Sequence, residues 1–282
     1  MLKKFFRKNN LFYSLFFFPF IYIVGWALIS LLINVFPFLE SNKSLYGTII
    51  TFVIFLCFLP FWSNHRWGKN LSNLLGIKNL SDKELFTSYI SEFLKALIII
   101  SVFIFILIKG EFVLFQTNLN LNIVLNSLFL ACFVGIAEEL VFRVWLFEEL
   151  NLFFKKKYAN FFQAFIFSIV HIRWDFSFLN NAQLLVGLFL LGIYLNRWRE
   201  NKNSSILIPL CFHASIVSLW FLTSTSLINI QTNIPKILFG PGTGNQINPI
   251  GGLLGILILC ILCFVKISNL TISRSIKNRI QN

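Results

Sequence analysis

Long, almost uninterrupted apolar runs constrain the fold of this chain more than any other feature of its sequence. Residues 11–38 contain no charged side chain, and comparable runs recur along the 282 residues. About 20 residues of α-helix, at 1.5 Å per residue, cross the hydrocarbon core of a bilayer, so runs of this length predict membrane-spanning helices. Charged residues make up only 12% of the chain, against roughly 25% in an average soluble domain. The composition therefore excludes a water-soluble globular fold.

The runs predict an all-α integral membrane protein, a bundle of about eight transmembrane helices. The run at residues 11–38 is too long for the apolar region of a signal peptide and lacks a small-residue cleavage pattern, so it is expected to be the first membrane helix. The expected helices span residues 11–38, 45–62, 86–108, 121–149, 158–174, 182–197, 204–223 and 250–266.

The basic residues predict the orientation of this bundle. With a cytoplasmic N-terminus, 18 of the 24 Lys and Arg residues fall in segments expected inside and four in segments expected outside. Cytoplasmic loops carry an excess of Lys and Arg, so we expect both termini to be cytoplasmic, in the plasma membrane or another energy-coupling membrane. The formal charge of +13 then resides in loops that meet anionic head groups, and no basic face remains for nucleic acid.

Two local patterns favour ordinary structural roles. Cys260 and Cys263 form a C-x-x-C pattern within the last apolar run, where buried packing thiols are expected. The glycine-rich segment 240–244 has neither a preceding strand nor a following Lys-Ser or Lys-Thr, so it predicts a turn rather than a phosphate-binding loop.

Ionisable residues in the fourth apolar run indicate chemistry. Glu138, Glu139 and Arg143 all fall inside it, and each ionised group near the membrane centre costs about 2.5–3.5 kcal/mol on insertion scales. Glu139 and Arg143 are four residues apart and can pair on one helix face, which leaves Glu138 to find another partner. A Glu–Arg pair that only fixes helix packing is the structural alternative. A second acidic pair, Glu148 and Glu149, ends the helix beside Lys155–Lys157 and is expected at the membrane interface.

Two histidines fall in neighbouring apolar runs. His171 is expected in the fifth helix, with Phe167 one turn earlier on the same face, and His213 in the seventh. His65 lies in an inside loop and is expected to be solvated. Counted from the inner helix ends, Glu138, His171 and His213 lie at similar depths, roughly 14 to 20 Å at 1.5 Å per residue. Ionisable groups at one level on three helices predict a shared polar cavity, because intramembrane charges usually mark functional sites.

Such a cavity could hydrolyse a peptide bond in two ways. A carboxylate beside an imidazole can take a proton from water and deliver it to a leaving amine, while a second imidazole hydrogen-bonds the oxyanion. Alternatively, Glu138, His171 and His213 are zinc-ligand types, and three protein ligands plus water make a hydrolytic zinc site. The sequence has no H-E-x-x-H motif, so we expect carboxylate-activated water without a cofactor and keep zinc as the alternative.

These residues, in this order, resemble the CAAX-protease and bacteriocin-processing (CPBP, or Abi) family. That family includes type II CAAX prenyl endopeptidases and proteins like lysostaphin resistance protein A. The resemblance rests on Glu138-Glu139-x-x-x-Arg143, Phe167-x-x-x-His171 and His213, and covers residues 125–222. It divides the chain into N-terminal helices one to three at 1–120, a catalytic core at 121–223, and an outside loop, last helix and basic tail at 224–282.

The resemblance implies an intramembrane endopeptidase, glutamic or metallo-, acting on a peptide or lipidated-protein substrate at the bilayer. It also implies that Glu138 and His171 activate the water, that Glu139 and Arg143 hold the site, and that His213 lines the oxyanion hole. The family carries Asn or Asp four residues after this last histidine, where this sequence has Val217. Either Ser215, Ser218 or a backbone N–H replaces that donor, or turnover is slow or absent.

Two other functions are alternatives to an active endopeptidase. A catalytically weak or inactive member would act as a membrane scaffold or bacteriocin-immunity factor, and Val217 motivates this alternative. A transporter or proton-coupled channel would also carry Glu, Arg and His in its helices, but it predicts internal repeats, which the sequence lacks.

Overall fold

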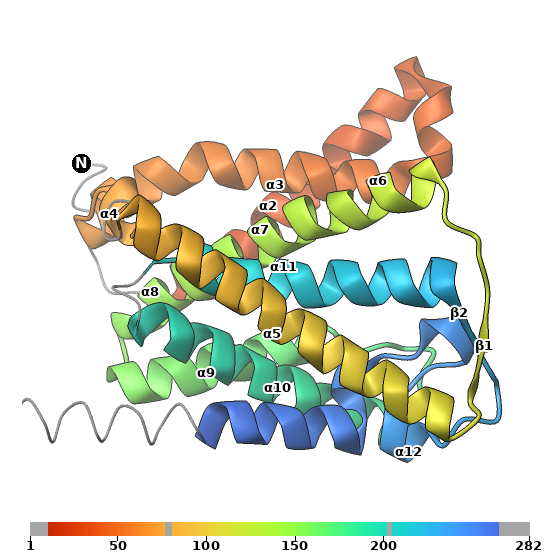
Figure 1. The fold of residues 1–282 in the computed structure, drawn as a ribbon. Helices are drawn as coiled ribbons and strands as arrows, with labels where there is room; N and C mark the ends of the chain where they lie inside the picture. The colour runs from red at the N-terminus through yellow and green to blue at the C-terminus, as the bar shows by residue number, and fades with distance from the viewer. Residues whose placement is uncertain (1–10, 77–80, 202–204, 265–282) are drawn as a thin grey trace, which may run out of the picture.

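The computed structural model describes residues 11–76, 81–201 and 205–264, and the fold is mostly helical (Figure 1). Within these residues, six helical regions are long and apolar enough to cross a membrane. The chain is therefore a multi-pass integral membrane protein, as the apolar runs predict. The six regions are Phe16–Val35, Pro37–Trp67, Asp82–Lys109, Leu121–Asn151, Phe178–Glu200 and Leu207–Leu227.

The two other predicted membrane helices are present but short. Helix α9 (Lys156–Ile169) has 14 residues, and the last described helix spans Leu253–Phe264. The predicted count of eight spanning helices and the cytoplasmic placement of the termini stay predictions. Many of the basic residues that carry the orientation, including those of the N-terminal segment and the C-terminal tail, lie outside the described residues.

The N-terminal part of the chain is an antiparallel helix pair. Helix α2 (Leu11–Val35) and helix α3 (Lys43–Trp62) pack along each other and are joined by a 3₁₀ turn at Pro37–Asn42. The apolar side chains of α2 point in all directions, and Phe20 and Ile23 are more than 60% exposed. A helix that is apolar all round satisfies its backbone internally and can face lipid.

The next elements lead into the core of the bundle. A π-helical turn at Ser63–Trp67 and the short helix α4 (Leu71–Leu75) precede helix α5 (Asp82–Lys109). A capping box starts α5, because Ser81 accepts from the Glu84 N–H while the Glu84 carboxylate accepts from the Ser81 N–H. A long helical region then runs through α6 (Leu121–Phe129), α7 (Gly135–Glu138) and α8 (Phe147–Asn151).

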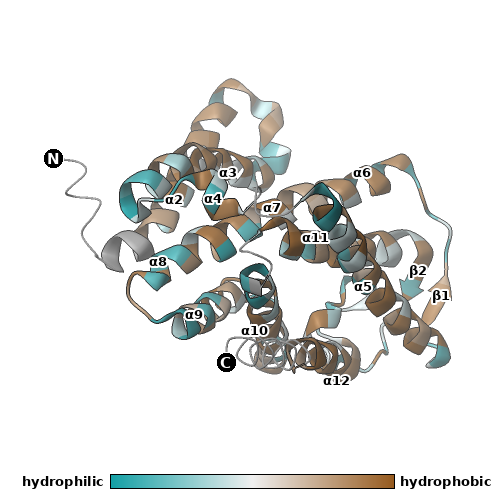
Figure 2. Cartoon of the chain, turned by 60° about the vertical axis from the view of Figure 1, so that its left-hand side comes forward, coloured by the Kyte–Doolittle hydropathy of each residue, from teal (hydrophilic) through white to brown (hydrophobic). Residues whose placement is uncertain are grey.

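Helices α10 (Phe178–Asn201) and α11 (Leu207–Leu222) complete the bundle around the fourth apolar run. The most extensive contacts join α5 with α11 and α9 with α10. Figure 2 shows apolar residues over most of these helices, and many of their large side chains are exposed outward. In a bilayer this exposed apolar surface faces lipid rather than water.

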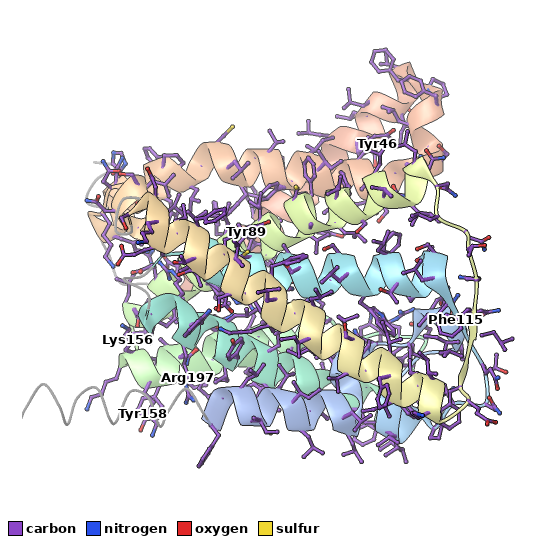
Figure 3. The ribbon with its side chains drawn as sticks, in the orientation of Figure 1. Tyr46, Tyr89, Phe115, Lys156, Tyr158 and Arg197 are labelled. Carbon is purple, nitrogen blue, oxygen red and sulfur yellow. The ribbon has the colours of Figure 1, made fainter. Side chains whose placement is uncertain are left out.

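A short antiparallel ribbon is the departure from a wholly helical fold within the described residues. Strand β1 (Val113–Phe115) pairs with β2 (Ile228–Ile230), with Leu114 opposite Asn229. The ribbon lies at the end of the bundle where Phe115 is labelled, opposite the end that carries Lys156 and Arg197 (Figure 3). The sequence did not predict it, because each strand has only three residues and the two are more than 110 residues apart.

The glycine-rich segment forms turns, as predicted. It follows the short helix α12 (Lys236–Phe239) and continues through 3₁₀ turns at Gly244–Gln246 and Pro249–Gly251 into the last described helix. Gly240 and Gly242 have φ values of 116° and 121°, a region that only glycine adopts without strain.

Candidate active site

Two π-helical segments interrupt the helix that carries the glutamates. The segments Leu130–Val134 and Glu139–Leu146 lie on either side of α7, so Glu138 ends the α-helical turn and Glu139 begins the second π segment. Bonding from i to i+5 winds the backbone more loosely than in an α-helix, and such segments occur frequently at functional sites. Here the two adjacent carboxylates both reach His213, one on each ring nitrogen.

The inner half of the site is a buried charged group. Oε1 of Glu139 lies 2.9 Å from Nδ1 of His213 and 3.3 Å from a guanidinium nitrogen of Arg143. Glu139 and Arg143 are completely buried, and the Arg143 guanidinium lies 4.0 Å from the centre of the Phe167 ring. The predicted i,i+4 pair is present, and it holds the imidazole in one orientation.

The outer half of the site is open. The Glu138 side chain is 22% exposed, with Oε1 3.6 Å from Nε2 of His171 and Oε2 3.7 Å from Nε2 of His213. The His171 side chain is 31% exposed, whereas that of His213 is 4% exposed. A carboxylate therefore lies between two imidazole nitrogens on an accessible face, slightly beyond direct hydrogen-bond distance from both.

His171 does not lie on a helix, contrary to the prediction of a fifth helix over 158–174. Helix α9 ends at Ile169, and His171 follows it in a turn. Nδ1 of His171 still lies 2.7 Å from the Phe167 carbonyl oxygen, one of the last carbonyls of the helix that lack an intrahelical partner. With Nδ1 donating to this carbonyl, Nε2 faces Glu138.

Asn181, which was not among the predicted site residues, holds the loop after His171. The Asn181 side chain accepts from the Arg173 N–H at 3.0 Å and donates to the carbonyls of Arg173 and Phe176 at 2.8 and 3.2 Å. These three bonds fix the turn that places His171 next to Glu138. Two adjacent asparagines at the start of an apolar run were the available signal, since polar side chains there are costly unless they hydrogen-bond.

Val217 lies beside an apolar cavity of about 640 Å³. Phe212, Val217, Leu130, Trp220 and Ile250 are among the residues that line it, whereas Glu138, His171 and His213 do not border it. The cavity adjoins the site rather than containing it. Of the two serines that could replace the missing donor, Ser218 uses its hydroxyl in another bond. The Ser218 hydroxyl donates to the Ser215 carbonyl, and the Ser127 hydroxyl to the Ser218 carbonyl.

The second acidic pair is buried against the α3–α4 connection, and its predicted position at the membrane interface stays a prediction. Glu149 is fully buried and accepts from Trp62 Nε1, Trp67 Nε1 and Arg66 Nε, at 2.7 Å in each case. Glu148 pairs with Lys69 at 2.6 Å. The partners of Glu148 and Glu149 come from the α3–α4 connection, more than 75 residues away. The local sequence around the two glutamates therefore does not indicate them.

Two arginines predicted to lie in inside segments, Arg66 and Arg199, are buried by protein contacts, being 6% and 3% exposed. Arg199 donates to the carbonyls of Arg143 and Leu74 and so reaches the site helix. His65 is not simply solvated, since its ring stacks on Phe61 and Nδ1 lies 2.9 Å from the Phe61 carbonyl oxygen.

The three residues predicted as zinc ligands in the alternative mechanism, Glu138, His171 and His213, lie close together. Across residues 11–76, 81–201 and 205–264, no group of three or more His, Cys, Asp or Glu side chains is placed to hold a metal ion. The donors Glu138, His171 and His213 are arranged around the carboxylate, with separate oxygens facing the two imidazoles. Carboxylate-activated water and zinc both stay predictions for this site.

Comparison with known proteins supports the expected family. Residues 4–71 match the family model DUF8676, a domain of unknown function. Searches of curated proteins and of solved structures found no match. Residues 119–219 match the family model described as type II CAAX prenyl endopeptidase Rce1-like, and this segment contains all five predicted site residues. This match confirms the predicted resemblance of residues 119–219 to the CAAX-protease and bacteriocin-processing family.

Proposed function

We propose that this protein is an intramembrane endopeptidase that hydrolyses a peptide bond of a membrane-associated substrate with water activated by Glu138 and His171. The family match supports a CAAX-protease-like endopeptidase in general terms. The observation that carries the mechanism is the position of the Glu138 carboxylate, 3.6 and 3.7 Å from the Nε2 atoms of two imidazoles and open on one side.

The contact distances allow a water molecule beside Glu138. Polar groups separated by more than 3.5 Å are commonly bridged by water. A water between Glu138 and His171 would transfer a proton to the carboxylate as its oxygen attacks the carbonyl carbon of the scissile bond. The same proton would then pass to the leaving amine when the C–N bond breaks. The base is thereby regenerated without a covalent intermediate.

His213 would stabilise the oxyanion. Its Nδ1 faces Glu139 and its Nε2 faces the space beside Glu138, where an N–H would donate to the developing oxyanion. Glu139 and Arg143 hold the ring without contacting the substrate, because both are fully buried. Position 217 offers no second donor, since its valine side chain is apolar.

The apolar cavity gives a place for nonpolar parts of a substrate. Its 640 Å³ falls within the range of small-molecule pockets, about 300–1,000 Å³. Peptides with apolar or lipid-modified side chains next to the cleaved bond are therefore the substrates to try first. Nothing in the lining selects one such group over another.

The test compares variants of the reconstituted protein on an internally quenched, lipid-modified peptide. Glu138→Gln and His171→Ala should each reduce the rate of cleavage by at least about 10²-fold, because general acid–base catalysis typically contributes about 10²- to 10⁴-fold to a rate. His65→Ala is the matched control, because His65 has the same Nδ1 contact to a carbonyl four residues earlier but no Glu138 beside it. Equal cleavage by all three variants would refute the proposed mechanism.

Val217 favours a second candidate, a catalytically weak member that acts as a membrane scaffold or immunity factor. If so, Glu138→Gln would leave a cellular phenotype of the gene unchanged, while a variant that unfolds the bundle would abolish it. Loss of the phenotype in Glu138→Gln, with normal amounts of protein in the membrane, would exclude the scaffold.

A further inference from the structure

Several buried polar side chains between α9, α10 and the Glu139–Leu146 segment lack hydrogen-bond partners. Gln163 is completely buried, and both its amide oxygen and its amide nitrogen are unpaired among the described residues. Oδ1 of Asn196 and Oε2 of Glu139 also lack a hydrogen-bond partner among the described residues. So do the three guanidinium nitrogens of Arg143, one of which lies 3.3 Å from Glu139 in the ion pair. Buried polar atoms are nearly always hydrogen-bonded, so such a concentration needs a physical explanation.

The register of α9 against α10 places these groups in order along the bundle. Lys156 pairs with Glu200 at 3.2 Å, and Asn196 donates to Asn160 at 3.0 Å. One turn further along α9, Ala164 packs directly on Gly192, where an added Cβ would lie 3.0 Å from the Ala164 Cα. The two helices therefore run antiparallel in close contact from the end that carries Lys156 (Figure 3).

One face of α9 carries the polar groups toward the site. Asn160, Gln163 and Phe167 are spaced three and four residues apart and share a helix face. The Phe167 ring lies under the Arg143 guanidinium, so this face is directed at the Glu139–Leu146 segment. From Lys156 to Gln163 the helix rises about 10 Å, and Phe167 lies one turn beyond.

Arg199, on α10 near Asn196, connects these polar groups to the helix that carries Glu138 and Glu139. It is 3% exposed, it donates to the Arg143 carbonyl, and its Nε has no partner among the described residues. We define the polar column as the five buried side chains that each have an atom without a partner among the described residues, together with Asn160, which accepts from Asn196. The five are Arg199, Asn196, Gln163, Arg143 and Glu139.

We propose that the polar column binds a file of internal water molecules that connects the Lys156 end of the bundle with Glu139. A buried water typically makes about three hydrogen bonds to polar groups that otherwise lack partners, and the column offers donors and acceptors in alternation. Glu139 contacts His213, which faces Glu138, so the file ends at the site. This role rests on the proposed hydrolysis, which consumes one water per turnover in surroundings that are otherwise apolar.

Hydroxyl-radical footprinting tests the bound water independently of proteolysis. Radicals formed from ordered internal water oxidise the side chains beside it, so Phe167 and Phe147, which lies 6.0 Å from the Arg199 guanidinium, should be oxidised at least several-fold faster than Phe55. Phe55 is as buried as Phe167 but packs among apolar rings of α2 and α3. The measurement is made on Glu138→Gln protein, so it does not depend on activity. Equal oxidation of the three rings would overturn the proposal.

The variant Gln163→Leu separates a hydrated column from a dry one. If water satisfies the amide, the variant should slow Phe167 oxidation and lower kcat several-fold with KM unchanged, without raising the melting temperature. If the column is dry, removing an unsatisfied amide should raise the melting temperature and leave kcat unchanged, which would overturn the proposal. Ser168→Ala is the control on the same helix, since the Ser168 hydroxyl donates to the Phe165 carbonyl within α9. If Gln163→Leu does not fold, the footprint of the Glu138→Gln protein still decides.

Failure of the unmodified protein to cleave the peptide and failure of Phe167 to be labelled are distinct results. Labelling of Phe167 without any peptide hydrolysis by unmodified protein would refute the proposed function and keep the water file. Peptide hydrolysis by the unmodified protein without labelling of Phe167 would refute the water file and keep the proposed function.

Discussion

His213 and Glu139 join α11 to the π-helical segment through a contact of 2.9 Å between Nδ1 and Oε1. The same carboxylate oxygen lies 3.3 Å from the Arg143 guanidinium, so one atom holds both the histidine and the arginine. All three residues are at most 3% exposed. The site thus consists of a buried scaffold, on which the more exposed pair Glu138 and His171 is placed.

This arrangement predicts strong coupling between Glu139 and Arg143. Glu139→Gln leaves a fully buried guanidinium without its counter-charge, which typically costs about 3–5 kcal/mol of unfolding free energy. The double variant Glu139→Gln, Arg143→Met removes both charges and should recover much of that loss. Unfolding of the four proteins of this double-mutant cycle in detergent measures the coupling. Additive losses would show that the pair does not stabilise the bundle.

Substitution of Val217 tests the oxyanion geometry. Val217→Asn introduces an amide one helical turn after His213, and it should raise kcat by up to about 10²-fold if both side chains face the developing oxyanion. Val217→Leu is the control, because it keeps an apolar side chain at the wall of the cavity. A fall in kcat with Asn, or an equal change with Leu, would contradict a role for this position in the oxyanion hole.

The Asn181 bonds predict that the turn after α9 determines the position of His171. Asn181→Ala removes three hydrogen bonds to that turn and should lower kcat by about ten- to a hundredfold, because displacements near 1 Å cost that much in positioned catalysis. The bundle should stay folded, since the turn is at its surface. Asn180→Ala makes the same change one residue earlier and serves as the control. If the two variants behave alike, Asn181 does not position His171.

Removal of metal ions tests the mechanism directly. A carboxylate-activated water predicts that a strong zinc chelator leaves kcat unchanged after prolonged incubation with the reconstituted protein. A zinc site built on Glu138, His171 and His213 predicts loss of activity and its recovery when zinc is restored. Elemental analysis of the same samples shows whether the chelator removed any metal.

Much of the architecture could be predicted because the bilayer imposes simple rules on the sequence. A spanning segment must be apolar, long enough and internally hydrogen-bonded, so the apolar runs locate the helices to within a few residues. The 121–149 run corresponds to helical residues Leu121–Asn151. Charges inside such runs are costly, which is why Glu138, Glu139 and Arg143 could be singled out without any structure.

The rest depended on contacts that local patterns do not encode. The end of α9 at Ile169 could not be placed, because residues 170–172 continue the apolar pattern without a glycine or proline. The burial of Glu149 could not be predicted, because its partners Arg66, Trp62 and Trp67 come from another part of the chain. The π-helical segments have no simple signature in a sequence, although they place Glu138 and Glu139 on the two sides of His213.

Glu149 also predicts how the N-terminal helices are held to the segment that matches the Rce1-like model. Its carboxylate, within residues 119–219, accepts from two indole N–H groups and a guanidinium of residues 62–67, which lie within the other matched segment at 4–71. Glu149→Ala removes this acceptor and should cost at least about 3 kcal/mol, because breaking a buried charged network leaves its donors desolvated. Lys69→Ala disrupts the neighbouring pair with Glu148, but Lys69 is half exposed, so it should cost less than about 1 kcal/mol. Limited proteolysis between residues 63 and 81 should accelerate in Glu149→Ala alone, and equal rates in the two variants would show that Glu149 does not hold the helix pair in place.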